Sequence, residues 1–226
     1  MSIGRLQPGG GVVERLLARP FALAVLLFAR AITAVRGLWP ESGPWRRQAV
    51  YFANHSSHGD FILIWAVQPP RQRRRLRPVA GADYWRRSRL TTFIGRDVFN
   101  AVLIERDAGT RTTDPVAQMV EALDEGSSLI LFPEGTRNLT EDILLPFKTG
   151  LYHLAGRRPG VDLVPVWIAN LNRVLPKGEI IPIPLICTVT FGEPLRLKEN
   201  EARDDFLDRA RQALLALAPK PQERGA

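Results

Sequence analysis

The sequence predicts an α/β fold with a mixed, mostly parallel central sheet flanked by helices, preceded by an N-terminal amphipathic helical segment. Three observations support this fold class. Short apolar runs alternate with longer amphipathic runs along most of the chain. A length of 226 residues with 45% hydrophobic content can bury a full core, and neither repeats nor low-complexity linkers divide the chain. We therefore expect a helical segment at residues 1–40 and one domain at residues 41–226.

The N-terminal segment from Pro20 to Val35 is apolar but is interrupted by Arg30. Its 16 residues fall short of the roughly 20 that a membrane-spanning helix needs. On a helix, Arg30, Thr33 and Arg36 fall on one side, beside a wide apolar face. This pattern favours a membrane-associating helix that lies in the interface over anionic headgroups. Packing on the protein's own core is one alternative. A secretory signal is another, which Glu14 in a long leader disfavours.

The remaining apolar runs predict strands and the amphipathic runs predict helices. The strands are Ala49–Ala53, Arg77–Ala80, Ala101–Ile104, Ser128–Phe132, Asp162–Ile168 and Ile186–Phe191. The helices are Asp60–Val67, Tyr84–Ile94, Pro115–Glu125, Lys148–Gly156 and Glu199–Ala218. Because strands and helices alternate, the strands should form a sheet with helices on both faces. Such sheets bind ligands at loops beyond the carboxyl ends of the strands.

The loop after the first of these strands, NHSSHGD, holds two of the chain's three histidines. A histidine at a strand end can act as a general base near neutral pH, and a carboxylate at the following helix start can fold back to its second ring nitrogen. Asp60 would then raise the basicity of His55 and fix its tautomer, while His58 in the turn would be a bystander. Asp60 also has an alternative role as the N-cap of the following helix, and one side chain can hardly fill both roles.

Two other chemistries use similar residues. A dinuclear metal site needs about five or more nitrogen and oxygen ligands, and only His153 remains as a further histidine, so we expect no metal. A Ser-His-Asp triad with Ser56 or Ser57 lacks the Gly-x-Ser-x-Gly elbow, and a serine adjacent to its base rarely aims well at it. A base without a protein nucleophile fits the loop better.

Two further strand ends carry arginine. The apolar strand in LILFPEGTR ends in a glycine-containing turn with Glu134 and Arg137, and Arg106 closes the run AVLIER. A guanidinium is well shaped to hold a phosphate with two hydrogen bonds. Each arginine alone is more often part of a surface ion pair. Their coincidence with the histidine loop predicts a phosphorylated acceptor.

These residues together resemble a known family. NHSSHGD, the Arg106 region, FPEGTR and VPV at Val164–Val166 are similar, in order, to the four motif blocks of glycerolipid acyltransferases, especially the 1-acyl-sn-glycerol-3-phosphate (lysophosphatidic acid) acyltransferases. PFKTG, which contains Lys148, resembles the segment after the third block. Gly59 and Asn138 depart from the bulkier residue and the serine that are frequent at these positions, which leaves the acceptor open.

The resemblance implies that His55 is the general base and that Asp60 is its partner. It implies a substrate-binding set of Arg106, Glu134, Gly135, Thr136, Arg137, Lys148 and Pro165. The reaction implied is transfer of a fatty acyl group from acyl-CoA or acyl-carrier protein to the free hydroxyl of lysophosphatidic acid, without a cofactor or an acyl-enzyme. A thiolate leaves readily because its conjugate acid has a pKa of about 8.5, so one base is enough. Backbone N–H groups of a turn such as Gly135–Thr136 would hold the oxyanion.

The net charge of +8, mostly from arginine, suits several polyanionic partners. The runs Arg71–Arg77 and Trp85–Arg89 would serve an acidic carrier protein, a phosphate-bearing coenzyme or an anionic membrane surface. A nucleic-acid-binding protein would explain the charge but not the two motif loops, so we expect no nucleic acid. A non-catalytic lipid-binding relative has no need of a base, whereas other lysophospholipids or lyso-aminolipids remain possible acceptors.

The cellular setting follows from two features. The single cysteine, Cys187, lies in an apolar run, which indicates a small buried side chain and a reducing compartment rather than a disulfide scaffold. The resemblance implies peripheral or monotopic attachment to the cytoplasmic face of the inner membrane.

Overall fold

The computed structural model describes residues 12–41, 43, 47–105, 109, 112–169 and 187–219 of the chain. Its centre is a seven-stranded sheet with the strand order β1-β7-β6-β2-β5-β3-β4. The strands are β1 (Arg36–Leu38), β2 (Ala49–Ala53), β3 (Leu76–Gly81), β4 (Val102–Ile104), β5 (Ser128–Leu131), β6 (Asp162–Ala169) and β7 (Thr188–Phe191). Neighbouring strands are parallel except for β6 and β7. The prediction of a mixed, mostly parallel sheet is confirmed.

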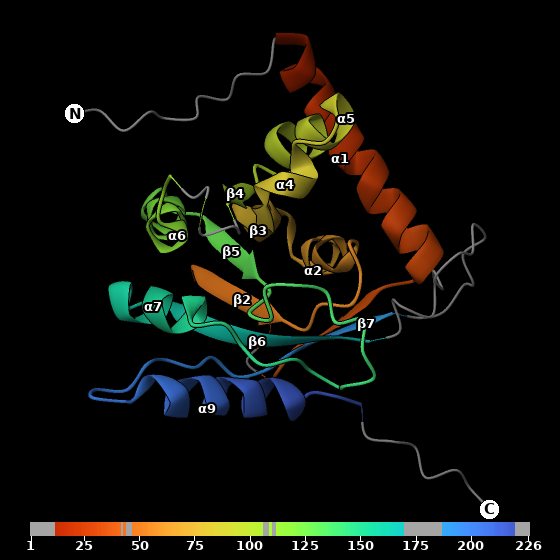
Figure 1. Cartoon of the computed structure of the whole chain (residues 1–226). Coiled ribbons are helices and arrows are strands. Elements are labelled where there is room, and N and C mark those ends of the chain that lie inside the picture. The colour runs from red at the N-terminus through yellow and green to blue at the C-terminus, as the bar shows by residue number, and fades with distance from the viewer. Residues whose placement is uncertain are drawn as a thin grey trace, which may run out of the picture.

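Helices cover both faces of this sheet (Figure 1). They are α1 (Val12–Thr33), α2 (Asp60–Val67), α3 (Pro70–Arg73), α4 (Ala82–Trp85), α5 (Arg89–Phe93), α6 (Pro115–Asp124), α7 (Gly150–Arg157) and α9 (Arg203–Leu215), with a π-helical turn η1 at Ile94–Val98. Helices α6, α7 and α9 share one hydrophobic core with the sheet, and α1, α2 and α4 share the other.

Strand β2 explains why the histidine loop lies at the centre of the molecule. All five of its residues are buried, which is typical of a parallel strand covered on both faces. Val50 and Phe52 pack in the α6–α7–α9 core, whereas Tyr51 packs in the α1–α2 core. Because β2 pairs with both β5 and β6, the loop at its carboxyl end emerges in the middle of the sheet edge.

The predicted boundaries of β2 and α2 match the structure, and most other elements shift by a few residues. The expected helix Tyr84–Ile94 instead divides into α4, α5 and η1. Ser88 is extended, with φ −146° and ψ 160°, and it forms a reciprocal capping box with Thr91 that starts a new helix. The first residue of the predicted strand Ile186–Phe191 lies outside the described residues.

Two short elements, β1 and α3, were not predicted. Three or four residues are too few for a periodic pattern to be read. Because β1 pairs with β7, the sheet already begins within residues 1–40, the segment expected to be separate from the domain. Cys187, immediately before β7, is a buried free thiol, as predicted.

Helix α1 has one side docked on the domain. Arg30 donates a hydrogen bond from Nη2 to the carbonyl oxygen of Ala66 at the end of α2, at 3.1 Å. Near the other end of α1, Phe21 contacts Phe93 edge to face, with ring centroids 5.7 Å apart. Packing on the domain, the alternative considered from sequence, therefore holds for this side of the helix.

The opposite side of α1 is exposed and apolar. Its large exposed side chains are Leu16, Leu17, Leu23, Leu27 and Phe28, which are between 54% and 70% accessible. The 18 residues Leu16–Thr33 are long and apolar enough to cross a membrane, by length and composition only. Helix α1 as a whole has 22 residues, because it continues upstream of the predicted apolar segment through Pro20.

Candidate active site

The histidine loop joins β2 to α2, and its two expected catalytic groups meet. Nδ1 of His55 lies 2.9 Å from Oδ2 of Asp60. The same oxygen accepts the backbone N–H groups of Ser56 at 2.7 Å and Ser57 at 2.9 Å. Asp60 is fully buried, so these donors replace the water that Oδ2 loses, whereas Oδ1 has no hydrogen-bond partner among the described residues. Its position in the first turn of α2 also favours negative charge through the helix dipole.

This contact fixes the chemistry of the imidazole. A carboxylate is an acceptor, so Nδ1 carries the hydrogen and Nε2 presents a lone pair. The His55 side chain is 13% exposed and its ring stacks on Phe132, with centroids 4.1 Å apart. The alternative role of Asp60 as an N-cap is not used, because Gly59 is the N-cap of α2 and the helix start has no side-chain cap.

The backbone of His55 is held by a second buried acid. Its N–H donates to Oε1 of Glu134 at 2.7 Å, and its carbonyl oxygen accepts the N–H of Asn138 at 2.6 Å. The other Glu134 oxygen, Oε2, accepts the N–H of Leu145 at 2.9 Å. Burial raises the pKa of Glu134, and these two N–H donors oppose the rise. At 1% exposure Glu134 lies beneath the loops and not on a cavity wall, unlike its expected place in the substrate-binding set.

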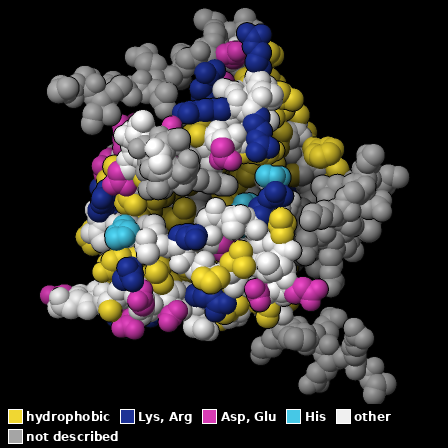
Figure 2. Space-filling model, viewed as in Figure 1, with side chains coloured by type: hydrophobic (Ala, Val, Ile, Leu, Met, Phe, Trp, Pro, Cys, Tyr) yellow, Lys and Arg dark blue, Asp and Glu magenta, His cyan; other side chains and the backbone are white. Residues whose placement is uncertain are grey.

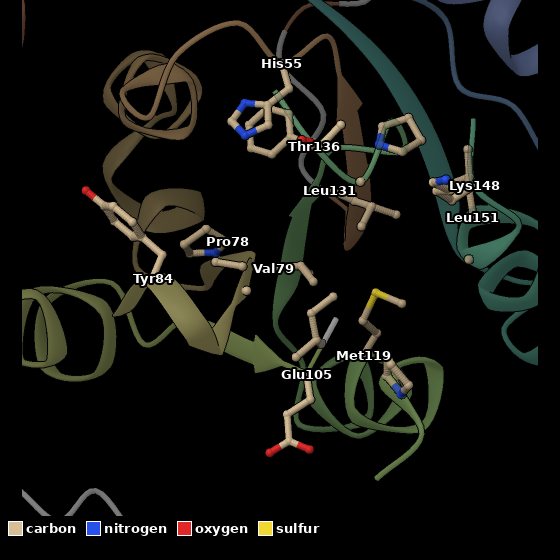
Figure 3. Close-up of a pocket in the computed structure, with 18 of the residues that line it drawn as sticks. His55, Pro78, Val79, Tyr84, Glu105, Met119, Leu131, Thr136, Lys148 and Leu151 are labelled. Atoms are coloured by element: carbon tan, nitrogen blue, oxygen red, sulfur yellow. The ribbon is translucent and has the colours of Figure 1, made fainter. Parts of the chain in front are cut away.

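A cavity of about 710 Å³ opens beside His55. In Figure 3, Tyr84 lies on one side of His55, Thr136 and Lys148 lie on the other, and Met119 lies farther along the cavity. The apolar part of the wall includes Pro78, Val79, Ile104, Met119, Leu131 and Leu151. A volume of this size fits the range of small-ligand pockets, and the apolar wall suits a hydrocarbon chain.

Basic side chains stand at the cavity without acidic partners. Arg137 and Lys148 both line it, and neither forms an ion pair with a carboxylate among the described residues. Figure 2 shows histidine and Lys or Arg side chains next to one another near the middle of this face. Positive charge that is not paired with a carboxylate in the described part of the chain suits an anionic ligand such as a phosphate.

The glycine turn between β5 and α7 brings Lys148 close to this wall. Gly135 has φ +71°, a conformation that side chains rarely adopt, and a Cβ there would lie 3.1 Å from Cγ of Lys148. The Gly135 N–H donates to the carbonyl oxygen of Phe132 at 3.0 Å. Of the two N–H groups expected to hold an oxyanion, the turn itself therefore uses that of Gly135 and leaves that of Thr136.

The structure does not bring the whole predicted set together. Pro165 lies in β6 opposite Phe52 and is not on the cavity wall, because the fourth motif block supplies a buried sheet strand. Arg106 lies outside the described residues. The cavity instead includes Tyr84, Arg87 and His58, of which the sequence marked His58 as a bystander. The one sequence signal for Arg87 was its place in the basic run WRRSR.

Comparisons with known proteins show which family the chain belongs to. The family model described as Acyltransferase matches residues 35–169, more than half of the chain. A 1-acyl-sn-glycerol-3-phosphate acyltransferase of Haemophilus influenzae is 29% identical over 176 residues, which cover 72% of this chain and 65% of that protein. The Escherichia coli protein of the same name is 32% identical over 160 residues, 64% of this chain and 59% of that one. The chain thus spans less than two thirds of the length of these relatives.

A solved structure supports the fold. The crystal structure of the 1-acyl-sn-glycerophosphate acyltransferase from Thermotoga maritima aligns with a TM-score of 0.65 at 20% identity, covering 93% of this chain and 83% of that one. The matched family segment runs from just before β1 to the end of β6, and it contains both the His55–Asp60 loop and the Glu134–Arg137 turn. The chain belongs to the acyltransferase family.

Proposed function

We propose that the protein is an O-acyltransferase that moves a fatty acyl group from a thioester donor, acyl-CoA or acyl-carrier protein, to the free hydroxyl of lysophosphatidic acid, making phosphatidic acid. The observation that carries this proposal is the His55–Asp60 pair at a cavity with an apolar wall and uncompensated cations. The names of the relatives support lysophosphatidic acid as the acceptor.

In the proposed reaction, Nε2 of His55 removes the proton of the acceptor hydroxyl while the hydroxyl oxygen attacks the thioester carbonyl carbon. Asp60 stabilises the imidazolium that forms. The tetrahedral intermediate collapses as the C–S bond breaks, and the thiolate leaves and takes up the proton from the imidazolium. No protein nucleophile and no cofactor take part. The N–H of Thr136 is the proposed donor to the oxyanion.

The substrate positions follow from the charges and the apolar wall. Arg137 and Lys148 are the proposed ligands of the acceptor phosphate, because both line the cavity beside the turn that carries Thr136. The wall around Val79, Leu131 and Met119 would receive a hydrocarbon chain.

We further propose that α1 attaches the protein peripherally or monotopically to the cytoplasmic face of the inner membrane. The exposed side of α1 offers leucine and phenylalanine side chains to the bilayer, and Arg19 is exposed for contact with anionic headgroups. A lipid surface is also where both the lysolipid acceptor and the product reside. Nucleic acid has no place in this proposal.

The experiment that tests the function uses purified protein in mixed micelles. Radiolabelled acyl-CoA and acyl-carrier protein are offered separately with a panel of lyso-acceptors, and His55→Ala is assayed beside the unsubstituted protein. Circular dichroism verifies that the variant is folded. We expect histidine-dependent acylation of lysophosphatidic acid. Transfer only to acceptors without a phosphate would keep His55 as base but remove Arg137 and Lys148 from their proposed role, and no transfer from either donor would overturn the function.

A further inference from the structure

His58, Tyr84 and Arg87 form a compact cluster on the cavity wall, apart from the groups used above. The rings of His58 and Tyr84 stack with centroids 4.4 Å apart and planes 16° from parallel. The Arg87 guanidinium lies over the Tyr84 ring, 5.9 Å from its centroid. All three side chains line the same cavity as His55. The cluster therefore combines an aromatic platform, a permanent cation and ring N–H and hydroxyl groups at one position.

The Tyr84 ring packs on the side chain of Trp85. Tyr84 meets the ring of Trp85 edge to face at 5.4 Å, and Trp85 is 9% exposed and contacts Phe61. A Cβ at Gly95 would lie 2.8 Å from the Trp85 ring, so η1 presses closely on the other side of that side chain. The Tyr84 ring thus packs against one buried ring, that of Trp85, as well as against His58 and Arg87.

Arg87 has no ion pair with a carboxylate among the described residues, although Asp83 lies on the same wall. Its neighbour Arg86 pairs with Glu105 at 3.6 Å. A guanidinium held over a ring at a cavity, with no carboxylate on it, suits binding of a phosphate.

This cluster and the Arg137–Lys148 pair lie on different sides of the base. In Figure 3, His55 stands between Tyr84 on one side and Thr136 and Lys148 on the other. The proposed reaction needs two anionic substrates bound at once, so two separate cationic positions match two ligands. Arg137 precedes Asn138, whose N–H donates to the His55 carbonyl oxygen, which places Arg137 near the base.

The two positions differ in the ligand that they suit. In lysophosphatidic acid the phosphate is only a few bonds from the attacking hydroxyl, so it belongs at the cations near His55. In both thioester donors a long phosphopantetheine arm separates the thioester from its phosphate. That phosphate need not lie next to the base and can bind where the cavity is open to solvent; His58 and Arg87 are both exposed residues of the cavity wall.

We propose that His58, Tyr84 and Arg87 form the subsite for the phosphate of the donor's phosphopantetheine arm. The inference rests on the proposed acyl transfer. Acyl-CoA and acyl-carrier protein share this phosphate, and coenzyme A carries further phosphates of its own. Arg87 is the main ligand, the Tyr84 ring lies against its guanidinium, and His58 stacks on Tyr84.

The test compares Arg87→Gln with two other variants by steady-state kinetics. We expect Arg87→Gln to raise KM for both donors about tenfold, as loss of a charge-assisted hydrogen bond does, with KM for lysophosphatidic acid unchanged. Arg137→Gln should show the reverse pattern. The matched control is Arg89→Gln, which removes an exposed arginine of the same basic run that is not on the cavity wall and should change neither KM.

The pattern of losses decides the assignment. If Arg87→Gln raises KM for both donors, the cluster binds the phosphate that the two donors share. If it raises KM for acyl-CoA alone, the assignment is overturned in favour of the phosphates that only the coenzyme carries. A raised KM for lysophosphatidic acid in Arg87→Gln would also overturn it.

Calorimetric titration with free coenzyme A separates this inference from the proposed function. Binding that weakens in Arg87→Gln but not in Arg89→Gln supports the subsite even if the protein transfers no acyl group. Conversely, active Arg87→Gln protein with unchanged donor KM and unchanged coenzyme A binding would overturn the subsite and leave acyl transfer standing.

Discussion

Glu134 holds the main chain of His55: one carboxylate oxygen accepts the N–H of His55 at 2.7 Å, and the other accepts the N–H of Leu145 at 2.9 Å. The same buried carboxylate thereby fixes the start of the histidine loop and the segment that leads to Lys148. The glutamate of FPEGTR is thus placed to position the base from beneath, and the neighbouring Thr136 and Arg137 reach the cavity.

The first prediction concerns Glu134→Gln. A carboxamide has one acceptor oxygen, so its NH₂ group would face one of the two N–H donors. We expect a loss of about 1 to 3 kcal/mol in the free energy of unfolding, and a lower kcat with little change in KM for the acceptor. Urea unfolding and steady-state kinetics measure the two effects, with the exposed Glu141→Gln as control. A raised KM for the acceptor at unchanged kcat would instead indicate that Glu134 binds the substrate.

The second prediction concerns Asp60→Asn. The substitution removes the charge that stabilises an imidazolium, while the amide oxygen of Asn can still accept from Nδ1, Ser56 and Ser57, because all three donate to the same oxygen of Asp60. We expect kcat to fall by about ten-thousandfold with a small change in KM, on the scale of other carboxylate–histidine pairs. Because the two residues act as a unit, adding Asp60→Asn to His55→Ala should cost almost nothing further. Additive losses in the double variant would argue against a shared role.

The pairing of His55 with Asp60 was predictable because a strand end and a helix start enclose a single short turn. The alternation of apolar runs also predicted the sheet class. The contact of Glu134 with His55 was not predictable in the same way. It joins residues 79 positions apart and depends on β2 and β5 lying side by side.

The Tyr84–Arg87 wall shows a second limit of sequence reasoning. A helical pattern over Tyr84–Ile94 gave no reason to expect a break, yet the capping box at Ser88 redirects the chain. Pro165 illustrates the converse: its motif resemblance suggested a pocket residue, whereas the all-buried pattern of β6 places it inside the sheet. The contact between His55 and Asp60, which are close in sequence, could be predicted from the sequence. Contacts between residues far apart in sequence could be found only from the structure.

The third prediction is an acid-dependent loss of stability at α9. Two hydrogen bonds from Arg209, at 2.8 and 2.7 Å, are the main cause that lowers the pKa of Glu201 from 4.5 to about 2. A lowered pKa means that the folded state binds this proton less readily than the unfolded state. The pair therefore contributes fully above pH 4.5, and its contribution is lost as the pH falls from 4.5 toward 2.

Urea unfolding at a series of pH values measures this dependence. Glu201→Gln should be less stable than the unsubstituted protein at neutral pH, and the difference should shrink through the acid range. Glu199→Gln, an exposed neighbour two positions away, is the matched control and should follow the unsubstituted protein. If the difference in the free energy of unfolding between Glu201→Gln and the unsubstituted protein stays constant with pH, the ion pair is not its source.

The last prediction concerns the exposed side of α1. Leu23 and Leu27 are 55% and 59% exposed, so changing both to glutamine should leave the unfolding transition nearly unchanged. If this side enters a bilayer, each substitution removes the gain from burying a leucine and should weaken partitioning about tenfold or more. Co-sedimentation with phosphatidylglycerol vesicles measures the loss, and Leu139→Gln, at a comparably exposed leucine outside α1, is the control.

Acylation of lysophosphatidic acid in vesicles should fall with binding, whereas turnover in detergent micelles should persist, because the substitutions lie outside the cavity wall. Full vesicle binding by the double variant would show that α1 does not provide the attachment.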